Sequence, residues 1–112
     1  MVERTVGWTV GPMQADYPAA FDREQGFSAA DWQRCLPGAV RGCALDLGQP
    51  GQATVLLGSG TLVLRWQALP PRQIALMRMP RLAVQYRFTG VADAERASFM
   101  RYFDLYTQRG GG

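Results

Sequence analysis

The stretch RLAVQYRF, residues 81–88, decides the fold because its side chains alternate strictly between apolar and polar or small. The large apolar side chains occupy every second position: Leu82, Val84, Tyr86 and Phe88. Successive side chains of a strand point to opposite faces of the sheet. The alternation therefore predicts a strand with one buried face and one wet face, as is typical of an antiparallel sheet.

The segments around this strand predict further strands of a meander. Gly58-Ser59-Gly60 has the composition of a hairpin loop. Pro70-Pro71 and Met79-Pro80 predict breaks, because proline cannot donate to a strand ladder. The expected strands cover residues 4–12, 41–47, 53–57, 61–66, 73–77 and 81–88.

Two helices are expected. Ser28 can cap a short helix over residues 28–38, which Pro37-Gly38 would end. Residues 91–109 predict a longer helix with one apolar stripe made of Phe99, Met100, Phe103 and Tyr106. Residues 13–27 predict an irregular segment with at most a helical turn at 19–24.

These elements predict an α+β domain. We expect a curved antiparallel meander of five to six strands, either open or partly closed into a barrel. The C-terminal helix packs on its apolar face, and a short helix lies near the N-terminus. With 112 residues, the chain is expected to form a single globular domain, residues 1–112, with a flexible tail at 110–112.

The composition excludes several chemistries. The chain has twelve arginines and nine acids, a net charge of +3, and no lysine, histidine or asparagine. Without histidine there is no imidazole base and no histidine metal ligand, so we expect no catalytic site, metal or cofactor. Two catalytic alternatives survive: a carboxylate pair drawn from Asp16, Asp22, Glu24 and Asp31, and a reactive thiol. Cys35 and Cys43 are expected to be reduced core thiols.

Five arginines without any acid between residues 47 and 92 raise the question of an anion site. Two interpretations are open. A converging set would hold phosphate or carboxylate groups, whereas a one-sided sheet simply has to wet its outer face. Nucleic acid is not expected, because the aromatic residues of these strands fall on the opposite face. The five are Arg65 and Arg87 on strands, with Arg72, Arg78 and Arg81 at strand ends.

The segment DLGQPG, residues 46–51, followed by strands and by residues 86–103, resembles PilZ domains, small β-barrels that bind cyclic di-GMP. Asp46 and Gly51 match the outer positions of the family's aspartate-x-serine-x-x-glycine motif, while Gly48 replaces its serine. The family's upstream arginine pair has no counterpart, since Arg34 and Arg41 are spaced too widely. The resemblance implies a degenerate member that acts through protein partners.

We therefore expect a small cytoplasmic binding or adaptor domain without enzymatic activity. Its contact regions would be the basic sheet face and the aromatic-rich helix, where Tyr102 and Leu105 fall off the buried stripe and suit a protein partner or self-association. The alternative is a small-ligand binder, with an anionic nucleotide-like ligand held by the arginines or an apolar one between sheet and helix. With no signal peptide at residues 1–10 and no long apolar run, we expect no membrane partner.

Overall fold

The structure is a computed structural model that describes residues 17–110, with side chains to residue 108. It has the element order of an α+β domain, with one antiparallel sheet and two helices. The strand expected at residues 4–12 lies outside the described residues, as does Asp16.

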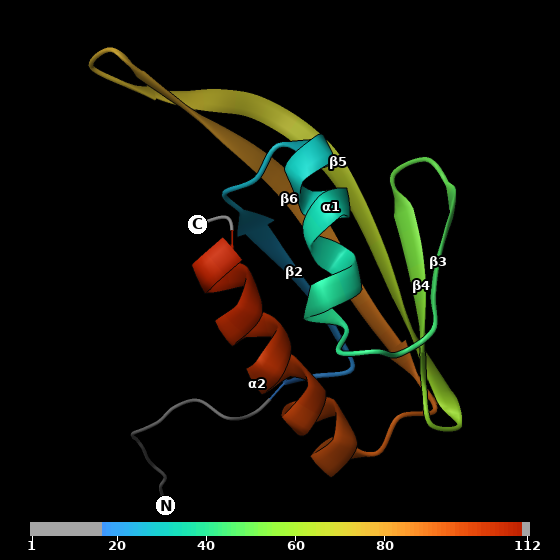
Figure 1. The fold of residues 1–112 in the computed structure, drawn as a ribbon. Coiled ribbons are helices and arrows are strands. Elements are labelled where there is room, and N and C mark those ends of the chain that lie inside the picture. Colours follow the sequence, from blue (N-terminus) through green and yellow to red (C-terminus); the bar gives the residue numbers. More distant parts are fainter. Residues whose placement is uncertain (1–16, 111–112) are drawn as a thin grey trace, which may run out of the picture.

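The sheet has five strands in the order β2-β6-β5-β4-β3, and every neighbouring pair is antiparallel. Strand β2 returns from the start of the described chain to pair with β6 at one edge, while the other four form a meander (Figure 1). Within residues 17–110 the sheet is open, so these strands do not form the barrel expected as one alternative. The bounds are β2 Ala20–Gln25, β3 Leu45–Gln49, β4 Gln52–Leu57, β5 Gly60–Ile74 and β6 Met77–Thr89.

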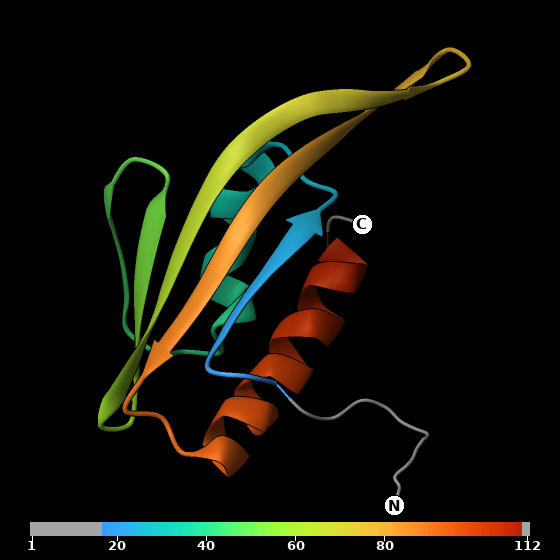
Figure 2. The ribbon, with the colours of Figure 1, turned by 180° about the vertical axis from the view of Figure 1, so that it is seen from behind.

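Both helices lie on the same face of the sheet. Helix α1 covers Ala29–Ala39 and α2 covers Asp93–Gly110, and the two stand side by side in front of the strands in Figure 1 and behind them in Figure 2. The opposite face of the sheet carries no helix, as Figure 2 shows for the described residues. The expected packing of the C-terminal helix on the apolar face is confirmed, and α1 shares that role.

The core lies between the sheet and the helices. The four alternating residues of 81–88 are all buried, as predicted. Aromatic rings meet edge-on at its centre, where Trp32 of α1 lies 5.8 Å from Phe103 of α2 between ring centroids and 6.3 Å from Trp66 of β5. Such edge-to-face pairs add to the free energy gained by burying apolar area. The fully buried large side chains are Trp32, Leu36, Val40, Val55, Leu62, Leu64, Leu82, Val84, Tyr86, Met100 and Phe103.

Strand breaks were expected at the prolines, and this expectation was wrong. β5 and β6 run through them and form one long hairpin, in which Pro70 and Pro71 occupy a shift of register between the pairs Leu69↔Arg81 and Arg72↔Met79. A bulge of this kind absorbs one extra residue without ending the ladder. Among the described strands, neither β4 nor β2 pairs with this part of the hairpin. Proline is tolerated on such free edges, because its missing N–H would have faced solvent.

Two further expectations were wrong in part. Residues 20–25 form strand β2 rather than an irregular segment, with Arg23 on the helix-covered side of the sheet. Helix α1 is capped by Ser28, whose Oγ accepts a hydrogen bond from the Asp31 N–H at 3.1 Å, but it continues through Pro37 to Ala39. Proline inside the last turn of this helix removes one N–H donor without stopping the coil.

Candidate functional site

Four of the five arginines lie on the uncovered face. Directly paired residues of antiparallel strands share a face, so Arg65 and Arg87 lie opposite to the buried residues of β5 and β6, as expected. Arg81 and Arg72 follow on the same face, farther along the hairpin. Arg78 pairs with Gln73 on the other face, so the five do not all converge.

Acidic side chains reach this face from strands that are distant in the sequence. β2 pairs with β6 and places Asp22 and Glu24 beside the arginines. An Asp22 Oδ1 accepts a hydrogen bond from Arg87 at 2.8 Å, and the two oxygens of Glu24 contact Arg81 at 3.0 Å and Arg72 at 3.4 Å. The acid-free run of residues 47–92 therefore does not create an acid-free surface.

The body of the sheet is close to neutral on its open side. Arg65 and Arg87 share this face with Asp22 and Glu24, and Asp46 of β3 lies there as well because it pairs with Thr54. A face that mixes both signs is typical of a solvated surface. The observed mixture favours the wet-face interpretation of Arg65 and Arg87.

The part of the hairpin that leaves the sheet is a different surface. We call residues 69–81 the arm, because beyond Leu82 the two strands pair only with each other among the described residues. Figures 1 and 2 show it extending past the helices and away from the body. It carries Arg72, Arg78 and Arg81 and no acid.

The tip of the arm is apolar and exposed. Its last paired residues are Ile74 and Met77, which are joined by the two-residue turn Ala75-Leu76. The exposed fractions are 54% for Ile74, 63% for Met77 and 98% for Leu76, and Met79 behind them is 42% exposed. Together they form an exposed apolar patch, and contiguous apolar patches on a monomer often mark interaction sites. Sequence reasoning missed this patch because it placed breaks at the prolines.

The outer surface of α2 matches the expectation in part. Leu105 is 56% exposed, and Tyr102 is half-buried with the Arg41 guanidinium 4.2 Å from its ring centroid. Tyr106 was expected on the buried stripe but is 37% exposed, at the edge of the core. Its ring lies over Gly38 of α1, where a β-carbon would collide with it.

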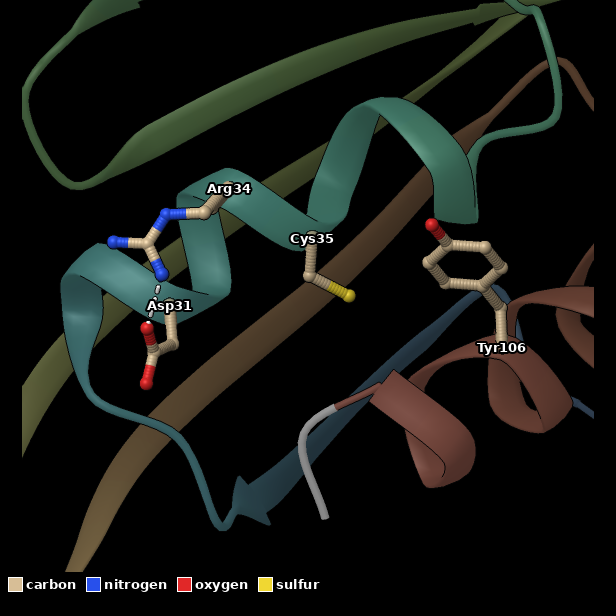
Figure 3. Close-up of a pocket in the computed structure, with 4 residues that line it drawn as sticks. All are labelled: Asp31, Arg34, Cys35 and Tyr106. Carbon is tan, nitrogen blue, oxygen red and sulfur yellow. Dashed lines mark hydrogen bonds and ion pairs between the residues drawn. The ribbon is translucent and has the colours of Figure 1, made fainter.

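The described residues line two shallow cavities on the helix side. One of about 310 Å³ lies between α1 and α2 and is lined by Asp31, Arg34, Cys35 and Tyr106. Figure 3 shows the Cys35 thiol pointing toward Tyr106, with Asp31 and Arg34 joined in an ion pair along α1. The other, of about 230 Å³, has mostly apolar walls between β4, the end of α1 and α2.

The three described carboxylates considered for catalysis do not form one site. Asp22 and Glu24 lie on the open face of the sheet, whereas Asp31 lies on α1 on the other side, and each already holds an arginine. Burial raises the pKa of the Cys35 thiol, which lowers the fraction of reactive thiolate. Neither cysteine is in a disulfide, and the described residues contain no cluster of three potential metal ligands.

A polar cluster that the sequence did not reveal ties β2 to α2. The Arg23 guanidinium donates two hydrogen bonds to the Asp104 carboxylate, at 2.7 Å and 3.1 Å, and the Tyr17 hydroxyl donates a third at 2.7 Å. The Arg23 side chain also lies over the rings of Phe21 and Tyr86, with its Cζ 5.1 Å and 5.4 Å from their centroids. The side chain of Asp104 is only 21% exposed.

The chain matches no protein-family model and no curated protein. No helix within the described residues is long and apolar enough to cross a membrane.

Proposed function

We propose that the protein is a non-catalytic binding domain and that the arm is its principal contact element. The observation that carries this proposal is the exposure of Ile74, Leu76 and Met77 at the end of a ribbon that leaves the body. An isolated two-stranded ribbon is marginally stable in water. Its apolar tip gains free energy from a partner, and nothing in the described body covers it.

The chemistry of the described residues supports a non-catalytic role. Asp31 lies on the other side of the sheet from Asp22 and Glu24, and all three are engaged by arginines. A pair of catalytic carboxylates needs two different environments within one site. The protein thus works through surfaces.

The outer surface of α2 provides a second contact region, as an adaptor requires. Tyr102 and Leu105 lie there, on the opposite layer from the open face of the sheet. Aromatic residues with one polar end are enriched at protein interfaces. This region suits a protein partner, while the arm binds elsewhere.

The test compares the full chain with an arm-less variant, in which residues 70–80 are replaced by Asn-Gly so that Leu69 and Arg81 flank a two-residue turn. Both proteins are titrated against duplex DNA, polyglutamate and anionic vesicles, and their self-association is measured by analytical ultracentrifugation. We expect the full chain to bind at least one of these and the arm-less variant to bind none of them. Thermal unfolding and circular dichroism establish that the variant remains folded.

Binding that survives removal of the arm would place the contact site on the body and overturn the proposal. A matched variant, Leu105→Asp, separates the second surface from the first. It should leave the binding of these anionic probes unchanged while removing any contact made through α2.

The mostly apolar cavity beside α2 favours a second candidate, a small-ligand binder. Leu57 and Phe99 form part of its apolar wall, and Arg41 stands at its rim. Such a site would take a small apolar molecule with an acidic group, which the guanidinium would contact. A thermal-shift series with fatty acids and nucleotides tests it: a shift that Leu57→Trp removes supports a ligand site, and no shift with any of them eliminates it.

A further inference from the structure

The apolar side chains of the arm are exposed in a gradient toward its end. Met79 is 42% exposed, Ile74 54%, Met77 63% and Leu76, in the turn, 98%. Ile74, Met77 and Met79 share the open face of the ribbon, and exposure rises from Met79 to Leu76 at the apex. The arm is therefore built to meet its partner end-on.

Arginines stand directly behind the tip on both faces of the ribbon. Arg72 shares the open face with Met79, and Arg78 shares the opposite face with Gln73. At about 3.3 Å per residue they lie about 3–7 Å behind the pair Ile74↔Met77. Arginine stems cover apolar surface while their guanidinium groups stay in a polar layer. Apolar residues ahead of two positive charges, one on each face of the ribbon, match the surface of an anionic bilayer. Such a surface has negative headgroups outside and an apolar interior.

The charges disfavour a second copy of the chain as the partner. The arm carries three arginines and no acid, and the one acid in contact with it, Glu24, lies at its base. Two arms side by side would bring six arginines together. On the helix side of the body, Asp31, Asp93 and Asp104 already hold arginines of their own, which leaves Glu95 as the one described acid there outside an ion pair with a described residue.

Nucleic acid and protein strands fit the arm less well. Residues 69–81 contain no aromatic side chain on which a base can stack. An extended peptide would add to a free strand edge, but Pro70, Pro71 and Pro80 remove N–H donors from the edges of this ribbon.

We infer that the arm inserts its tip, residues 74–77, into the surface of an anionic lipid bilayer, with Arg72 and Arg78 among the headgroups. This inference rests on the proposed function, because it names the partner of the arm. A two-residue overhang of about 7 Å beyond Arg72 agrees with the depth of about 5–10 Å that interfacial segments reach. The expectation of no membrane partner rested on the missing apolar run, which a ribbon inserted end-on does not need.

The test is co-sedimentation of the full chain with phosphatidylcholine vesicles, with and without phosphatidylglycerol. We expect binding only with the anionic lipid, weakening as salt is added because exposed charges are screened. Leu76→Asp should weaken it by about tenfold or more, since it places a charge at the apex. Leu56→Asp is the matched control: Leu56 lies on the open face of β4 with 54% exposure, and its substitution should change binding less than about twofold.

Arg72→Gln combined with Arg78→Gln separates the charge from the apolar contact. This double variant should lose most of the salt dependence while remaining as stable as the native chain. If the native chain bound neutral and anionic vesicles equally well, the assigned role of the arginines would be overturned.

The outcomes also separate the inference from the function on which it rests. Arm-dependent binding to duplex DNA or polyglutamate without vesicle binding would overturn the inference that the partner is a lipid bilayer. The arm would still be the binding element. No arm-dependent binding to any of the three would overturn both. Vesicle binding that Leu76→Asp does not weaken would also contradict insertion of the tip.

Discussion

The body and the arm are made from the same two strands but are held together differently. In the body, β5 and β6 are flanked by other strands and covered by two helices, so their alternate side chains are buried. In the arm the same strands have only each other, and the side chains at the end face solvent. Stability therefore resides in the body, whereas the arm contributes surface. Substitutions in the body should therefore change the free energy of unfolding, whereas substitutions in the arm should change binding.

The largest difference is expected between two apolar truncations. Phe103→Ala removes a fully buried ring that lies 5.8 Å from Trp32 and 5.9 Å from Tyr86, and should lower the free energy of unfolding by about 3–5 kcal/mol. Leu76→Ala, at the tip of the arm, should change it by less than about 0.5 kcal/mol. Urea unfolding of both variants measures this. Equal losses would mean that the arm is packed in solution and that the comparison fails.

A second pair of variants compares ion pairs. The side chains of Arg23 and Asp104 are 32% and 21% exposed, whereas those of Arg72 and Glu24 are 58% and 44% exposed. Asp104→Asn should cost about 2 kcal/mol, because charged hydrogen bonds in a sheltered site are lost. Glu24→Gln should cost less than about 1 kcal/mol. A double-mutant cycle of Asp104→Asn with Arg23→Gln should show strong coupling, and additive losses would show that the cluster does not act as a unit.

The smallest expected effect is a pH dependence that belongs to the body alone. Burial, with the nearby Asp104, raises the pKa of Tyr86 above its usual value of 10.0 even though Arg23 opposes this change. The unfolded chain then loses the tyrosine proton first, so stability is full below pH 10 and falls as the pH rises above it. Tyr86→Phe should flatten this fall and cost about 1 kcal/mol at neutral pH through its lost hydrogen bond to Gln25.

The arm-less variant is the control for this titration, because residues 69–81 contain no tyrosine or cysteine. Its stability should follow the same curve as that of the full chain above pH 10. A different curve would show that the arm shields the core.

The sequence predicted the body well because local periodicity carried the information. The alternation at 81–88, the cap at Ser28 and the apolar stripe of the last helix all concern neighbours within a few residues, and all three agree with the structure, apart from the exposed edge at Tyr106. Apolar burial on one face is a strong constraint on register. These elements therefore needed no knowledge of distant contacts.

The errors arose where a distant partner or a missing neighbour decides the outcome. Arg23 lies on the helix-covered side, where it forms an ion pair with Asp104, 81 residues away. No local sequence pattern predicts that pair. Asp22 and Glu24 reach the open face through the pairing of β2 with β6, which lie far apart in the sequence. The prolines lie within strands because those strands have free edges at that point. Strand propensity alone cannot show which edge is free.

The two-residue turn at Ala75-Leu76 is a position at which the chain can be cut into two fragments. Cutting it there would separate residues 1–75 from 76–112, yet the ladder from Thr61↔Thr89 to Leu69↔Arg81 would still join the two pieces. The same point can accept an inserted sequence, because exposed loop tips tolerate additions that do not disturb the core. The protein thus offers a natural position for fragment complementation, in which two separately produced halves reassemble around one sheet.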